Sequence, residues 1–458
     1  MRTVILVAIF LGSMVSGCGD DGPCDANANS GCDDGKSCER IQGGEETTCA
    51  APVTVEGRVF DLATNAGIGG ARIVALDANS AASSFVAVSD SSGHYSLIIP
   101  TPRNPDGTPA ASAQITLRAD AAGYLTFPSG IRPALPFDTA NPALVDGRYA
   151  IASALTDVGL LAIGPGGPAT GTIRGRVADR GDGAGALVVA EVAGVGHTAV
   201  ADRGGDFAIF NVPAGAADVA AYALGHNYDH ATADVIADRD VEVNLALSDA
   251  ATSTVSGSVQ IVNGQMGTAT SVILVVESTF DAKLARGETP AGLRAPQPGT
   301  APNVTGAFSI AGVPAGRYVV LAGFENDYLV RDESSIGGTQ VVHQQVTAGQ
   351  DVAIAQSFKV TGSVDIVSPG ANGPEMVTGT PQFKWVDDSS EDRYEVTVFN
   401  SYGNTTWQGG TLKNVVTLTY GGPPLESGMY YQVRVRSIKD PAEQISKSEE
   451  LKGVFFVP

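Results

Sequence analysis

Two histidines in this chain have a spacing that suits a shared metal ion. His226 and His230 stand in the run His-Asn-Tyr-Asp-His, and Asp234 follows closely. On an extended strand, residues four apart lie on one face, so the two imidazoles would point the same way. Asp229 would lie on the opposite face, and no third ligand has a fixed position. His226 and His230 are therefore weak metal candidates, and we expect no bound metal or other cofactor.

Motifs for enzyme chemistry are scarce. No serine lies in Gly-x-Ser-x-Gly, so the nucleophile turn of a hydrolase is missing. Gly35-Lys36-Ser37 lacks the upstream glycine of a phosphate-binding loop, and Gly67-Ile68-Gly69-Gly70 lacks the third glycine of a dinucleotide-binding turn. Carboxylates are plentiful but scattered, so no acid–base pair can be chosen. We predict that the protein is not an enzyme.

The composition favours short strands and excludes some partners. The chain has 458 residues with 49 acidic and 28 basic side chains, which gives a net charge of −21. Such a charge argues against nucleic acid as a partner, because Lys and Arg are needed to displace counterions from phosphates. Its 56 glycines, 25 prolines and 6% aromatic residues are typical of strands joined by turns.

Four of the five cysteines lie close together near the N-terminus, at Cys24, Cys32, Cys38 and Cys49. In an exported chain they would form two disulfides, with three pairings open. Residues 18–50 are rich in acidic and poor in apolar side chains, which predicts a disulfide-bonded acidic stalk or knot. The alternatives are a calcium site and a zinc site. The calcium candidates, Asp20, Asp21, Asp25, Asp33 and Asp34, do not have EF-hand spacing, and the cysteines lack a Cys-x-x-Cys pair.

The first residues have the features of an export signal. Arg2 is followed by the apolar stretch 4–11, which is too short to span a bilayer. Val15-Ser16-Gly17-Cys18 resembles the lipobox of bacterial lipoproteins. The resemblance implies cleavage after Gly17 and a lipid on Cys18 that anchors the chain in a membrane. Gly19, where aspartate would resemble an inner-membrane retention signal, favours the outer membrane. The alternative is an ordinary signal peptide cleaved nearby.

Three stretches share one pattern of strands and turns. Each opens with an alternating strand, and each continues with a glycine, any residue and an aromatic residue that lead into another strand. The stretches begin at Thr54, Thr172 and Thr254, and their turns are Gly93-His94-Tyr95, Gly205-Asp206-Phe207 and Gly306-Ala307-Phe308. This repeat predicts three related domains.

The repeated unit resembles the carboxypeptidase regulatory-like domain, a seven-stranded Greek-key sandwich of the transthyretin and starch-binding-like type. The matching motifs are Gly70-Ala71-Arg72-Ile73, Asp90 to Tyr95, Ala121-Ala122-Gly123-Tyr124 and Pro314 to Tyr318. The resemblance covers roughly residues 53–359. It implies no peptidase, because no histidine begins a His-x-x-Glu motif.

The C-terminal segment is similar to a fibronectin type III module. Trp385 precedes a Leu-x-x-Gly turn at 425–428 and a Tyr-x-Val-x-Val strand at 431–435. In such a module the early tryptophan is a core residue. We therefore expect Trp385 to be buried, whereas Trp407 has polar neighbours and is a candidate for stacking on a ligand.

We expect an all-β protein of tandem Greek-key β-sandwich domains after a short disulfide-rich segment. Placed end to end, they would form a rod of roughly 100 Å or more. The predicted divisions are a lipoprotein signal peptide at 1–17, a Cys-rich acidic stalk at 18–52, regulatory-like sandwiches at 53–168, 169–250 and 251–360, and a fibronectin type III-like sandwich at 361–458.

Two functions fit these observations. The first is a non-enzymatic cell-envelope lipoprotein, exported and held at the membrane, that acts as a structural spacer or binds other envelope proteins, with the insertions 101–113 and 285–303 as contact loops. The second is binding of polysaccharide at the cell surface, for which fold alone is a weak argument. The aromatic residues that would stack on a sugar are Trp407, Tyr228, Phe324 and Tyr328.

Overall fold

The structure is a computed structural model that describes residues 24–26, 29–110, 114–130, 132–139, 142–178, 185–262, 270–282, 284, 286–296, 304–324, 341–355, 357–361, 363–388 and 390–458. These residues form β-strands and one three-residue 3₁₀ helix, η1 (Glu277–Thr279). The predicted all-β fold is confirmed. Within the described ranges, no helix has the length and apolar character needed to cross a membrane. The signal segment and Cys18 lie outside the described residues.

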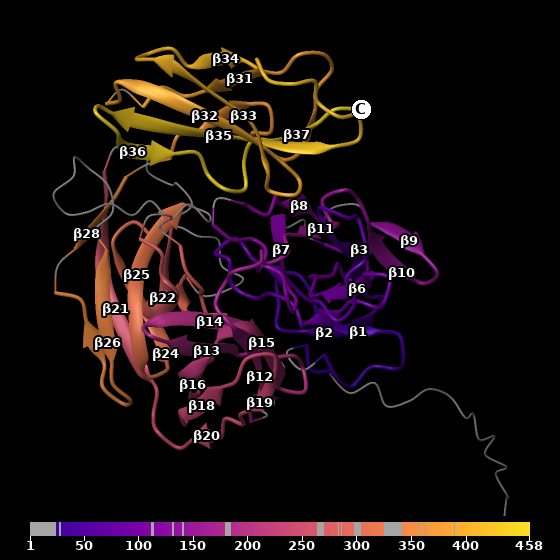
Figure 1. The fold of residues 1–458 in the computed structure, drawn as a ribbon, viewed down its shortest axis with the longest axis vertical. Helices are drawn as coiled ribbons and strands as arrows, with labels where there is room; N and C mark the ends of the chain where they lie inside the picture. Colours follow the sequence, from indigo (N-terminus) through magenta and orange to yellow (C-terminus); the bar gives the residue numbers. More distant parts are fainter. Residues whose placement is uncertain are drawn as a thin grey trace, which may run out of the picture.

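We name the parts of the molecule by the predicted divisions. Module 1 is 53–168, module 2 is 169–250, module 3 is 251–360 and module 4 is 361–458. The knot is the described part of 24–52. In Figure 1, module 4 (yellow) lies across module 1 (purple) and module 3 (orange), and module 2 (magenta) lies between the latter two.

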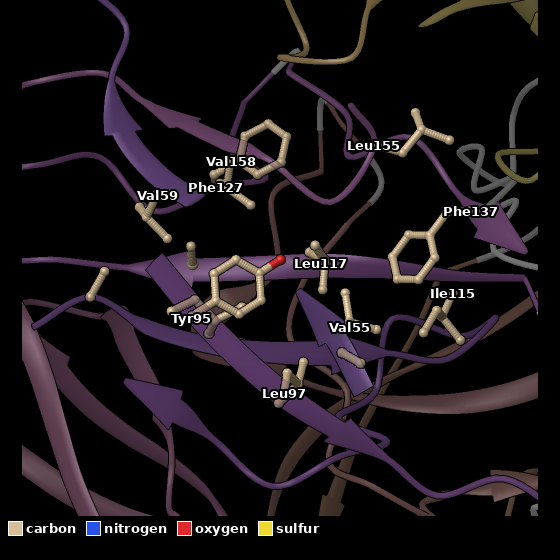
Figure 2. Close-up of a cluster of buried hydrophobic side chains, with 14 of the residues drawn as sticks. Val55, Val59, Tyr95, Leu97, Ile115, Leu117, Phe127, Phe137, Leu155 and Val158 are labelled. Atoms are coloured by element: carbon tan, nitrogen blue, oxygen red, sulfur yellow. The ribbon is translucent and has the colours of Figure 1, made fainter. Parts of the chain in front are cut away.

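Module 1 consists of two sheets around one core. One sheet has the order β11-β3-β10-β9 with β6 also on β3, and the other has the order β5-β4-β7-β8. The strands are β3 (Val53–Asp61), β4 (Arg72–Leu76), β5 (Ala87–Val88), β6 (His94–Ile99), β7 (Gln114–Asp120), β8 (Phe137–Asp138), β9 (Ala143–Val145), β10 (Arg148–Ile151) and β11 (Val158–Leu160). Alternate residues of β6, namely Tyr95, Leu97 and Ile99, are buried, as its period-2 pattern requires. Figure 2 shows Tyr95 and Leu97 in this core with Leu117 and Phe127.

Modules 2 and 3 repeat one arrangement. Module 2 contains β12 (Thr170–Arg176), β13 (Leu187–Val192), β14 (Val195–Val200), β15 (Asp206–Pro213), β16 (Gly215–Tyr222), β17 (Asn227–Tyr228), β18 (Ala231–Val235), β19 (Asp240–Glu242) and β20 (Leu247–Ser248). Module 3 contains β21 (Ser253–Val262), β22 (Thr270–Val276), β23 (Arg294–Ala295), β24 (Ala307–Val313), β25 (Gly316–Phe324), β26 (Val342–Val346), β27 (Val352–Ala353) and β28 (Phe358–Thr361). In both, the first strand pairs with the strand after the glycine-aromatic turn, and both pairs have a β-bulge.

Module 4 is a sandwich of a three-stranded and a six-stranded sheet. Its strands are β29 (Ile366–Ser368), β30 (Glu375–Met376), β31 (Gln382–Trp385), β32 (Arg393–Asn400), β33 (Thr405–Leu412), β34 (Thr417–Thr419), β35 (Tyr430–Lys439), β36 (Glu443–Lys447) and β37 (Val454–Phe456). Trp385 is 1% exposed and packs edge-on against Tyr394 at 5.3 Å between ring centroids. The expectation that Trp385 is a core residue is confirmed.

The knot is docked on module 1. Disulfides Cys24–Cys38 and Cys32–Cys49 join the segment that carries β1 (Ser37–Arg40) and β2 (Thr47–Ala50). The Arg103 main chain donates to the Arg40 carbonyl and accepts from the Gln42 N–H, both at 2.9 Å. Of the two predicted forms, stalk or knot, these residues adopt the knot, because their main-chain groups pair with the insertion that follows β6.

The predicted end-to-end rod is wrong. Leu187, Val189 and Tyr222 of module 2 share one buried cluster with Val272 and Tyr318 of module 3, and hydrogen bonds link module 1 to the other three modules. The reason is that apolar side chains on the outer faces of the sandwiches are buried against neighbouring modules. Alternation within a strand cannot show this, because it says which face is apolar and not what covers it.

Candidate functional site

All four modules line a polar cavity of about 360 Å³. Module 1 supplies Arg118 and Asp120, module 2 supplies His197, module 3 supplies Glu288, and module 4 supplies Glu450. Burial lowers the pKa of the His197 imidazole below its ordinary value, so this ring is neutral at pH 7. The side chains that line the cavity include several charged groups. Whether these groups could act on a ligand depends on whether they are free or already paired with one another.

Arg118 is the centre of this site. It is 2% exposed and lies on β7. Its Nε donates to the Asp120 carboxylate at 2.8 Å, its Nη1 to Glu288 of module 3 at 2.6 Å, and its Nη2 to Thr198 Oγ1 of module 2 at 2.9 Å. Burial alone lowers the pKa of the guanidinium, but the Asp120 and Glu288 carboxylates outweigh it and hold the pKa above its usual range. The cation is thus engaged by three modules at once.

Other arginines of module 1 make the same kind of contact. The Arg72 Nη2 atom donates to the Asp206 carbonyl of module 2 at 2.8 Å. The Arg132 Nη2 atom donates to the Tyr402 carbonyl of module 4 at 2.8 Å. Guanidinium groups suit this role, because their five donors can satisfy carbonyls and carboxylates of several elements. These side chains link modules by hydrogen bonds to main-chain carbonyls.

A repeated junction joins successive modules. Asn211, in the bulge of β15, accepts from the Gly123 N–H of module 1 at 2.8 Å, and its amide donates to the carbonyls of Ala121 and Tyr124. At the matching bulge of β24, the Gly312 carbonyl accepts from the Gly225 N–H of module 2 at 2.7 Å.

Both bulge residues need a left-handed backbone, with φ of +58° at Asn211 and +72° at Gly312, which Asn and Gly adopt most readily. The sequence expectations did not include this junction. A signal was present, since Asn211 and Gly312, the residue types that adopt positive φ most readily, stand at the same place before Pro213 and Pro314.

The four aromatic ligand candidates do not form a common surface. Tyr228 is 6% exposed and belongs to the module 2 core, so its ring face is not open to a sugar; this corrects the expectation. Trp407 is half-buried, with its ring 5.2 Å from Tyr420 and 6.2 Å from Phe383. Tyr328 and the side chain of Phe324 lie outside what the structure describes.

Within the described ranges, the histidine pair gains no third ligand. His230 is exposed and its Nδ1 lies 3.3 Å from Asp218, while His226 lies in the turn between β16 and β17. Among the described residues, one group of three potential metal ligands comes within coordinating distance: Cys24, Cys32 and Cys49. Those sulfurs belong to the two disulfides, so none is a thiolate.

No family model matches the chain, and no curated protein matches it. Among solved structures, it resembles the Bacillus anthracis TIE protein at 10% identity, with 85% of this chain and 68% of that chain covered and a TM-score of 0.16. It also resembles a streptococcal ancillary pilin (11%, 67% and 98% covered, TM-score 0.15) and a DUF3823 family protein from Bacteroides uniformis (14%, 45% and 100% covered, TM-score 0.20). With TM-scores this low, the likenesses carry no argument about arrangement or role.

Proposed function

We propose that the protein is a non-enzymatic cell-envelope lipoprotein whose modules form one compact body that binds other proteins. The observation that supports it most is the engagement of Arg118 by Asp120, Glu288 and Thr198, which come from three modules. A catalytic site needs a group poised to react, whereas these charges are used to hold the modules in place. A fixed arrangement of modules in turn presents a constant outer surface to partners.

The anchor in this proposal is the lipid on Cys18. Cys24 is bonded to Cys38 in the knot, and the knot pairs with module 1. Five residues lie between Cys18 and Cys24, so the two cysteines are six residue steps apart. An extended chain of that length spans at most about 20 Å. The folded body would therefore lie close to the membrane and would not project from it on a long stalk.

The anchor is tested by fractionating cells that express the full chain. We expect Cys18→Ala to move the protein from the membrane pellet to the soluble fraction. The matched control is Ser16→Ala, which keeps a small residue before the cysteine and should stay in the pellet. Retention of Cys18→Ala in the pellet would show that the lipid anchor is wrong.

A second experiment with the full-length protein distinguishes protein binding from polysaccharide binding, the alternative function. Detergent-solubilised full-length protein is applied to a polysaccharide panel and, in parallel, cross-linked to envelope proteins. We expect saturable cross-linking and no retention on the panel, since Tyr228 is buried and Trp407 half-buried. Retention that is lost in Trp407→Ala and kept in Trp407→Phe would overturn protein binding in favour of polysaccharide.

A further inference from the structure

β33 lies at the edge of the large sheet of module 4. β33 is the last strand of the module 4 sheet, in the order β30-β37-β35-β32-β33. Its inner side pairs with β32, from Arg393 opposite Leu412 to Val398 opposite Trp407. No strand in the described part of the chain pairs with its other side. An edge strand presents main-chain N–H and C=O groups that another strand can pair with.

Three other edge strands, β14, β15 and β24, are contacted by neighbouring modules. On β14, the carbonyls of Thr198 and Val200 accept from Arg118 and Arg72 of module 1. The Arg72 side chain also reaches the Asp206 carbonyl on the edge strand β15. On β24, the Gly312 carbonyl accepts from the turn of module 2. The packing of modules that protects these edges leaves β33 without such a contact among the described residues.

The composition of β33 suits pairing with an identical strand. Its sequence, Thr-Thr-Trp-Gln-Gly-Gly-Thr-Leu, contains no charged side chain. In an antiparallel two-fold pair the residue on the axis faces its own copy, so a charge at that position would repel itself. Absence of charge on β33 matters more because the chain has a net charge of −21.

Packing within module 4 also fixes the conformation of β33 before a second strand binds. On its inner face the Trp407 ring covers Gly409, where an added Cβ would lie 2.5 Å from the ring. At its end Leu412 is 77% exposed, an apolar side chain that pairing would shield. A strand fixed by its own packing loses little conformational entropy when a second strand binds.

We propose that two copies of this chain pair antiparallel through β33, with the two-fold axis at Gln408. This register places Trp407 opposite Gly409 and Thr405 opposite Thr411 of the second copy, and it continues the module 4 sheet across the dimer. The inference rests on the proposed function as a protein-binding body and specifies one partner, a second copy. One strand pair is much smaller than a standard interface of about 1,600 Å², so the dimer depends on concentration.

Disulfide trapping tests the register in the full-length protein. Gln408→Cys would place two thiols on the axis, within the Cα separation of about 4.4–6.8 Å that a disulfide requires. Mild copper–phenanthroline oxidation should yield a covalent dimer. The matched control is Thr397→Cys, on β32 directly beside Gln408 and one strand further from the axis. Equal cross-linking of the two variants would overturn the proposal.

Charge substitutions test the same pairing without a bond. Gln408→Lys and Gln408→Glu should each raise the dimer dissociation constant about fivefold, because either charge faces its own copy. Thr397→Lys should not. Light scattering of full-length protein over a range of concentrations, with the detergent contribution subtracted, gives the constant. If only one of the two substitutions, Gln408→Lys or Gln408→Glu, weakens binding, the partner is a different, charged strand and the proposal is overturned. A monomer at every concentration would overturn the dimer, while the anchor and envelope-protein tests would still decide the proposed function.

Discussion

Arg118 of module 1 and Glu288 of module 3 lie 2.6 Å apart although 170 residues separate them in the chain. The same guanidinium binds Asp120 beside it and Thr198 of module 2. These contacts link three sandwiches through a single buried cation. A buried charge is stabilising only when its partners are in place, so the arrangement of the modules and the ionisation of this cluster depend on each other.

Arg118→Met should destabilise the protein by about 3–5 kcal/mol, because it leaves Asp120 and Glu288 without their counter-charge. Urea unfolding measures the change. The control is Arg148→Met, which breaks the exposed pair with Glu56 in the same module and should cost no more than about 1 kcal/mol. Equal losses for the two variants would mean that Arg118 does not link the modules.

Asn211 should hold modules 1 and 2 together. Asn211→Gly keeps the left-handed backbone and removes three hydrogen bonds to module 1, so we expect a larger radius of gyration in X-ray scattering. Asn211→Ala should do the same and unfold about 1–2 kcal/mol more easily, since alanine strains this backbone. Asn414→Gly is the control, a turn residue with φ of +60° in module 4. An unchanged radius in Asn211→Gly would contradict the junction.

Asp157 should make module 1 less stable as the pH rises. Its carboxylate accepts from the Arg58 N–H at 2.9 Å, and burial raises its pKa above the usual 3.8. The unfolded chain therefore releases this proton first, and stability falls between pH 3.8 and the raised pKa. Asp157→Asn removes this pH-dependent loss of stability. The stability of the variant relative to the wild type should therefore increase as the pH rises from 3.5 to 7. Urea unfolding at several pH values measures it.

Asp90, in the same module, should give a pH dependence of stability opposite in sign to that of Asp157. Hydrogen bonds from Ser92 and His94 hold the pKa of the Asp90 carboxyl below its usual value. Its stabilisation is present above pH 3.8 and is lost as the pH falls through the lowered pKa. Asp90→Asn should therefore lose stability relative to the wild type from pH 2 to 5. Profiles that change in the same direction for Asp90→Asn and Asp157→Asn would contradict one of the two assignments.

Trp407 should contribute to the stability of module 4. A buried tryptophan replaced by alanine costs about 3–5 kcal/mol, and Trp407 is half-buried against Tyr420 and Phe383, so we expect about 2 kcal/mol for Trp407→Ala. Trp407→Phe should cost less because a ring remains. Thermal unfolding measures both variants. Unchanged stability in Trp407→Ala would show that the ring makes no such contact and would return it to the set of ligand platforms.

The strands could be predicted, but most of the candidate site could not. The turn at Gly93-His94-Tyr95 predicted that a strand follows, and β6 (His94–Ile99) begins there with Tyr95, Leu97 and Ile99 buried. Tyr228 shows the limit of the method, because it was a candidate for stacking on a sugar while its ring lies in the core. Neighbours in sequence alternate between faces, so they do not report the burial of the residue between them.

The sequence by itself determined the all-β class and the two-disulfide segment, because side-chain alternation, turn glycines and clustered cysteines act over a few residues. Tertiary structure decided which cysteines pair, that the knot is docked, and that the modules pack into a compact body. Those outcomes depend on contacts such as Arg118 with Glu288 and Asn211 with Gly123, whose partners are far apart in the chain. Local pattern shows that a buried arginine or a bulge asparagine needs a partner, and only the packing of sheets on one another decides which partner it finds.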